Sequence, residues 1–141
     1  MTTKFGVSYY SSLKSGSKIF RIKNNGVTNN QKIYNLVNLN NQIVVSTKDW
    51  IKLFDLKKNS FSNLESPPIK ETFNSWGINK DDSGRAWVVH DKGISIYNSS
   101  NNVTKHYLNQ NGNKFNLPTN DFYTVLPISN NEAWITGYDN V

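Results

Sequence analysis

The stretch GRAWVVH at residues 84–90 decides the fold, because related stretches occur before and after it. They read NQIVVST at residues 41–47 and NEAWITG at residues 131–137. Each begins with a turn-forming residue, continues with a polar residue and then enters an apolar strand. Successive copies are 43 and 47 residues apart, so the chain is built from a structural repeat.

The middle copy shows how one repeat is organised. Alternation of apolar and polar residues predicts four strands, at residues 76–79, 86–90, 93–98 and 103–107. Gly84 lies in a tight turn before the second of them, and Asn replaces it in the other copies because both residues tolerate positive φ. Four antiparallel strands at this period are typical of β-propeller blades, which bury both faces only when neighbouring blades pack against them. The sequence therefore predicts an all-β fold of propeller blades.

The repeats divide the chain into a partial blade, two full blades and a truncated blade. The predicted boundaries are residues 1–31, 32–71, 72–120 and 121–141. A closed propeller takes at least about four blades, or roughly 180 residues, so we expect an incomplete ring or an open arc with apolar sheet surface exposed at its open end. We favour a fragment of a longer protein over two alternatives, a short protomer that self-associates into a ring and an open β-arc of another shape.

Composition narrows the classes of function. The chain has no cysteine, which excludes disulfides, thiolate metal sites and cysteine nucleophiles. Its formal net charge is +6, but the lysines are scattered, so no nucleic-acid partner is predicted. No apolar run is long enough to span a membrane, and residues 1–10 do not resemble an export signal.

Three motifs carry a resemblance to a known family. Residues 82–87 (DSGRAW) resemble the D-x-G-x-x-W core of propeller hairpins, and residues 93–98 (GISIYN) resemble a G-G-L-x-R-Y-D strand. Residues 117–126 (LPTNDFYTVL) are similar to the L-P-s-N-x-V-x-s-I segment that opens repeats of the two-component regulator propeller family. The chain resembles this family over about residues 33–141, although Val44 replaces the tryptophan in the first copy.

This resemblance implies a periplasmic or extracellular sensor region ahead of a membrane segment and a histidine kinase, which in many Bacteroidota is tied to glycan detection. The expected function is non-catalytic sensing of a small ligand, with an oligosaccharide as the expected ligand class. The expected partners are this ligand and the remaining blades of a longer chain or a second copy. Two alternatives stay open: a protein–protein interaction scaffold and, ranked last, a propeller lyase of the kind that opens cyclic lactone antibiotics.

One group of residues at repeat positions is predicted to be structural: Asn41, Asp82, Gly84, Trp87, Asn131 and Trp134. Asp82 can accept backbone N–H bonds from its turn. Trp87 and Trp134 occupy matching strand positions, which favours a place in the core between blades over contact with a ligand.

A second group is predicted to contact a ligand. Trp50 and Trp76 lack such repeat partners, and aromatic faces can stack on the apolar faces of sugar rings. The loop residues Asn74, Asp91 and Tyr138 are expected to lie alongside them.

No catalytic residue, metal site or cofactor is predicted. His90 and His106 are the only histidines, and adjacent strand residues such as His90 and Asp91 point to opposite faces, which argues against a catalytic dyad. We interpret His90 as a polar residue at a blade edge and His106 as solvent-facing. The loop around Asp81 lacks the later acidic ligand that a calcium site requires.

Overall fold

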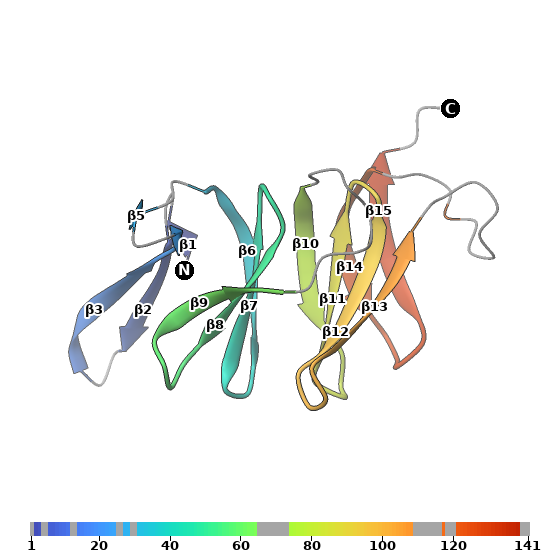
Figure 1. Cartoon of the computed structure of the whole chain (residues 1–141). Coiled ribbons are helices and arrows are strands. Elements are labelled where there is room, and N and C mark those ends of the chain that lie inside the picture. Colours follow the sequence, from blue (N-terminus) through green and yellow to red (C-terminus); the bar gives the residue numbers. More distant parts are fainter. Residues whose placement is uncertain are drawn as a thin grey trace.

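The computed structural model describes residues 2–3, 6–11, 14–24, 27–28, 31–64, 74–108, 117 and 121–138. Within these ranges the regular elements are β-strands, and their antiparallel sheets stand side by side in an open arc (Figure 1). The predicted all-β fold with propeller-type blades is confirmed. The predicted boundaries at residues 71 and 120 lie outside the described residues, as do residues 118–120 of the repeat-opening segment. The described part of the chain has no helix with the length and apolar character needed to cross a bilayer.

The strands follow one another along the described chain. They are β1 (Thr2–Thr3), β2 (Gly6–Ser11), β3 (Lys14–Arg21), β4 (Lys23–Asn24), β5 (Val27–Thr28), β6 (Ile33–Leu39), β7 (Gln42–Thr47), β8 (Ile51–Asp55), β9 (Ser60–Asn63), β10 (Ser75–Lys80), β11 (Arg85–His90), β12 (Gly93–Asn98), β13 (Val103–Leu108), β14 (Asp121–Pro127) and β15 (Ala133–Tyr138).

Two four-stranded sheets occupy the centre of the arc. The first full blade has the strand order β6-β7-β8-β9, and the second full blade has the order β10-β11-β12-β13. The four strands predicted in the middle repeat are all found in the second full blade, to within one residue at each end. Smaller sheets flank the two blades, β1-β2-β3 and β4-β5 before them and β14-β15 after them. The first strands β6, β10 and β14 lie next to one another, and we call them the inner strands.

Adjacent blades are joined by apolar clusters on the two faces of β11. Val88 is fully buried in a cluster that includes Val44 of the first full blade. Trp87 points to the opposite face, where it shares a second cluster with Val125 of β14. Successive side chains of a strand alternate between faces, so one strand contributes to both interfaces. The second full blade is therefore covered by a neighbour on either side.

The turn between β10 and β11 is held by Asp81, and not by Asp82 as predicted from the sequence. Asp81 Oδ1 accepts a hydrogen bond from the Arg85 backbone N–H at 3.0 Å, and Oδ2 accepts one from the Trp87 indole N–H at 2.9 Å. The Arg85 guanidinium also lies 2.7 Å from Oδ2. Gly84 has a φ of 74° in this turn, which glycine adopts without strain. Asp82 is exposed, because β10 runs on to Lys80 and the turn directs the next carboxylate inward.

The protonation state of Asp81 reflects the same contacts. Burial alone raises the pKa of its carboxyl group. The hydrogen bonds from Arg85 and Trp87, together with the Arg85 charge, outweigh that effect and hold the pKa below its usual value. Asp81 is therefore an ionised anchor for the hairpin.

We expect Asp81→Ala to lower the free energy of unfolding by about 2–4 kcal/mol, because it removes charge-assisted bonds and leaves the buried Trp87 indole N–H without its acceptor. Asp82→Ala is the matched control and should change this free energy by less than about 0.5 kcal/mol. Urea unfolding followed by tryptophan fluorescence measures both variants. Equal losses in the two variants would contradict the role assigned to Asp81.

The face of the β14–β15 sheet that points away from the second full blade is apolar and exposed. Leu126 and Trp134 lie directly opposite each other across the two strands, and their exposed fractions are 55% and 70%. Trp87, at the matching repeat position, is only 6% exposed because the β14–β15 sheet covers it. The core position predicted for Trp134 is therefore corrected: within the described residues, no sheet covers its face. The surface agrees with the apolar open end expected from the sequence.

We expect the chain to self-associate through this face, because contiguous exposed apolar side chains on a flat sheet favour association. The double variant Leu126→Lys/Trp134→Glu should shift the solution mass towards the monomer. Leu56→Lys, at an exposed apolar side chain in the β8–β9 turn, should leave the mass unchanged. Light scattering after size exclusion gives the mass, and a wild-type chain that is monomeric at all concentrations would contradict this prediction.

Candidate functional site

Each inner strand carries an irregularity in its pairing with the next strand, and an aromatic residue occupies it. The register shifts lie between Ile33 and Asn35, between Ser75 and Gly77, and between Phe122 and Thr124. The residues enclosed by these shifts are Tyr34, Trp76 and Tyr123. A bulge re-aims the side chain that it contains, so the same position is set apart in three successive sheets.

These three rings form a row across the inner strands, which we call the aromatic row. The ring centroids of Tyr34 and Trp76 are 4.7 Å apart, and those of Trp76 and Tyr123 are 6.3 Å apart. Tyr34 and Trp76 are half-buried, whereas Tyr123 is 52% exposed. Trp76 thus has repeat partners, contrary to the sequence analysis. They were missed because the residue type changes from Tyr to Trp to Tyr, although the spacings of 42 and 47 residues follow the repeat.

Gly77 allows the inner strands to approach closely beside this row. A Cβ atom added at Gly77 would lie 2.5 Å from the Tyr123 carbonyl oxygen and 2.8 Å from the Thr124 Cα. Both atoms belong to the backbone of β14, so no side-chain rotation would relieve the clash. The absence of a side chain at residue 77 therefore helps to bring Trp76 next to Tyr123.

Polar residues predicted as ligand contacts lie at the same end of the sheets. Asn74 immediately precedes β10, and its backbone N–H and side-chain Nδ2 donate hydrogen bonds to Asp91 Oδ2 at 3.2 and 3.3 Å. The Asp91 N–H donates in turn to the Asn74 carbonyl at 3.2 Å. Tyr138 pairs with Asp121 at the corresponding place in the β14–β15 sheet. The structure thus brings Asn74, Asp91 and Tyr138 to the end of the sheets where the inner strands begin, the upper end in Figure 1.

One carboxylate oxygen at this end lacks a donor. Asp91 Oδ1 is buried and has no hydrogen-bond partner among the described residues. A buried acceptor without a donor costs free energy, so Asp91 Oδ1 has an unused acceptor position beneath the surface at this end of the sheets.

Trp50 does not join the aromatic row, which corrects its prediction as a ligand-facing residue. Its side chain is 7% exposed, and its indole N–H donates to the Leu64 carbonyl at 3.1 Å. The ring packs edge-on against His90, with centroids 5.5 Å apart. Trp50 is a core residue between the two full blades because the loop after β7 turns its ring inward.

His90 is also a core residue, not a polar group at a blade edge. It is completely buried, and its Nε2 lies 2.9 Å from Ser95 Oγ, which lies 2.8 Å from His106 Nδ1. The Lys92 backbone N–H donates to His90 Nδ1, so the neutral ring carries its proton on Nε2 and donates it to Ser95. His106 is half-buried instead of solvent-facing. Burial, reinforced by the nearby His106, lowers the pKa of His90 to about 3.

This pKa makes stability depend on pH. Between pH 6.5 and 3 the unfolded chain binds a proton at His90 that the folded chain does not bind, so stability falls as pH decreases through this range. We expect a loss of about 2 kcal/mol in the free energy of unfolding between pH 7 and pH 5 from His90 alone. His90→Asn should be less stable at pH 7 but should show a flatter pH dependence. Urea unfolding at both pH values tests this, and an unchanged slope in the variant would refute the assignment.

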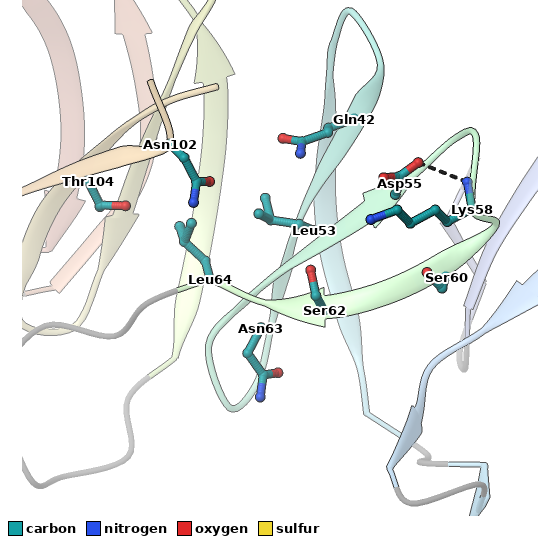
Figure 2. Close-up of a pocket in the computed structure, with 10 residues that line it drawn as sticks. All are labelled: Gln42, Leu53, Asp55, Lys58, Ser60, Ser62, Asn63, Leu64, Asn102 and Thr104. Atoms are coloured by element: carbon teal, nitrogen blue, oxygen red, sulfur yellow. Dashed lines mark hydrogen bonds between the residues drawn. The ribbon is translucent and has the colours of Figure 1, made fainter. Parts of the chain in front are cut away.

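A separate polar cavity of about 280 Å³ lies at the opposite end of the strands. Its lining residues are Gln42, Leu53, Asp55, Lys58, Ser60, Ser62, Asn63, Leu64, Asn102 and Thr104. Figure 2 shows amide and hydroxyl groups around the apolar side chains of Leu53 and Leu64, with the Lys58 N–H donating to Asp55. The cavity suits a small hydroxylated molecule, and the sequence analysis did not identify it. Within the described ranges, no group of three or more His, Cys, Asp or Glu side chains is placed to hold a metal ion.

Comparison with known proteins shows that solved structures share the fold of this chain. No known family profile and no curated protein matches the chain. Among solved structures, the chain is similar to two crystal structures of the extracellular domain of BT4673 from B. thetaiotaomicron. One describes BT4673 as a putative one-component system, and the other describes it as a putative hybrid two-component system. Each match has a TM-score of 0.72 and 12% sequence identity, and covers 96% of this chain. The chain spans 18% of the length of those proteins.

Proposed function

We propose that this chain is a non-catalytic, ligand-binding part of a periplasmic or extracellular sensor of the two-component regulator propeller type, and that it binds an oligosaccharide. The observation that carries this proposal is the aromatic row, in which the fold repeats one aromatic position across three inner strands. Its fold is shared with extracellular domains of a two-component system, which supports the sensor role and the location.

The chemistry of the row suits a carbohydrate. Sugar rings have apolar C–H faces that pack on aromatic rings, and hydroxyl groups at their edges that need polar partners. The aromatic row supplies the first kind of contact. Asn74, Asp91 and Tyr138 lie at the same end of the sheets and supply the second kind, and Asp91 Oδ1 has an unused acceptor site.

The histidines support a non-catalytic role. His90 is withdrawn into the core between the blades, and its lowered pKa keeps it neutral at physiological pH. Asp81 is committed to the hairpin through Arg85 and Trp87. His90 is therefore closed to solvent, and Asp81 lies beyond the far end of β10 from Trp76.

We expect Trp76→Ala to weaken oligosaccharide binding by about tenfold, because it removes the central ring of the row. Trp134→Ala is the control, since Trp134 is exposed on the outer face of the β14–β15 sheet and away from the row. A glycan array identifies binders, and calorimetry with the best of them measures both variants. Equal affinity in Trp76→Ala and the wild-type chain, or no binding to any glycan, would count against the proposed function.

A further inference from the structure

The fold places two residues beside each ring of the aromatic row at equivalent positions. In the second full blade these are Asn74 and Asp91, whose backbones are joined by the bond from the Asp91 N–H to the Asn74 carbonyl. In the first full blade the same bond runs from the Lys48 N–H to the Lys32 carbonyl at 3.1 Å. In the β14–β15 sheet the equivalent residues are the register partners Asp121 and Tyr138. The framing positions therefore change from two lysines to Asn and Asp, and then to Asp and Tyr.

Within the described residues, neither lysine at the Tyr34 end of the row forms a salt bridge. Lys32 and Lys48 are exposed, and the Lys32 ammonium lies 5.0 Å from the centroid of the Tyr34 ring. Asp49 follows Lys48 in the chain and accepts a hydrogen bond from the neutral Gln31 amide, which does not remove the charge of a carboxylate. The salt bridge that the described residues form is Arg85–Asp81, in the hairpin at the opposite end of the strands. Lys32, Lys48 and Asp49 together give the Tyr34 end a formal charge of +1, whereas Asp91 and Asp121 give the other end a formal charge of −2.

The Trp76–Tyr123 end of the aromatic row carries hydrogen-bond acceptors. Asp91 Oδ2 receives two hydrogen bonds from Asn74, while Oδ1 is buried and lacks a donor within the described part of the chain. Asp121 adds a second carboxyl side chain two residues before Tyr123, at the start of β14 and in register with Tyr138. An ionised carboxylate accepts hydrogen bonds from hydroxyl groups and repels anions. This end therefore favours neutral sugar residues.

We propose that the aromatic row binds an acidic oligosaccharide in one orientation, with a uronic acid at the Tyr34 end and neutral residues at the Trp76–Tyr123 end. This inference rests on the proposed function and adds the ligand's charge and direction. A uniformly charged polyanion, such as a nucleic acid or a fully acidic polysaccharide, fits less well because it would place anions beside Asp91 and Asp121. Surface lysines without these carboxylates would not favour a singly acidic oligosaccharide over a uniformly charged polyanion.

The test compares three soluble oligosaccharides of equal length: a neutral galacto-oligosaccharide, one with a single terminal galacturonic acid, and an oligogalacturonate with a uronic acid at every residue. Calorimetry at low ionic strength should give an affinity about three- to tenfold higher for the singly acidic oligosaccharide than for the neutral one. Lys32→Gln/Lys48→Gln should abolish this preference. Lys57→Gln/Lys80→Gln, which removes two exposed lysines in hairpins away from the aromatic row, should leave it intact.

The remaining variants separate the two proposals. Asp91→Asn should strengthen binding of the fully acidic oligosaccharide, and Trp76→Ala should weaken binding of all three. Trp76-dependent binding without a preference for the singly acidic ligand would overturn the charge inference and leave the proposed function standing. The charge inference would also fall if the fully acidic ligand bound best and Asp91→Asn had no effect. If no oligosaccharide bound in a Trp76-dependent manner, both proposals would fail.

Discussion

Each blade of this chain depends on its neighbours to bury the second face of its sheet. β11 illustrates the constraint, since Val88 packs towards the first full blade and Trp87 towards the β14–β15 sheet. A fully buried apolar side chain contributes roughly 1.5–3 kcal/mol, which exceeds the net contribution of about 1 kcal/mol from an ordinary hydrogen bond. Contacts between blades are therefore the main source of stability, and the ladders within a sheet mainly set the register. Trp134 illustrates the same constraint, because it occupies the repeat position of Trp87 but is exposed where no described sheet covers it.

The repeat made much of the fold predictable from sequence. Turn residues and alternating apolar residues recur at a nearly constant period, so the four strands of the second full blade were located to within one residue. The same reasoning failed where a side chain's direction depends on local geometry. It assigned the turn to Asp82 instead of Asp81, because both acids fit the pattern and only the length of β10 decides which one points inward. It placed Trp50 on a surface because a tryptophan without a repeat partner gives no information about the fold of its loop.

The aromatic row was only partly predictable for a related reason. Trp76 was selected from its residue type, and Asn74, Asp91 and Tyr138 from their loops, and the structure brings these residues to one end of the sheets. Tyr34 and Tyr123 were not related to Trp76 because the residue type changes along the repeat and because a bulge breaks the strict alternation on which strand reasoning depends. Spacing in the sequence still relates them to Trp76, but only the pairing of the inner strands shows that the rings are adjacent.

Because of the bulges, the residues of the aromatic row can change without a loss of stability in the apolar clusters between blades. A residue enclosed by a bulge is released from the ladder, so its side chain can change from Tyr to Trp without disturbing the apolar clusters between blades. The positions beside it are held by backbone bonds, as in the Lys48–Lys32 and Asp91–Asn74 pairs, and these bonds are indifferent to the side chain. Lysine, asparagine and aspartate can thus occupy the same place in successive sheets at little cost to folding. A repeat of this kind keeps the geometry of the row constant while its charge varies from sheet to sheet. In the proposed function, this combination is the means by which an arc of similar blades would distinguish one end of a ligand from the other.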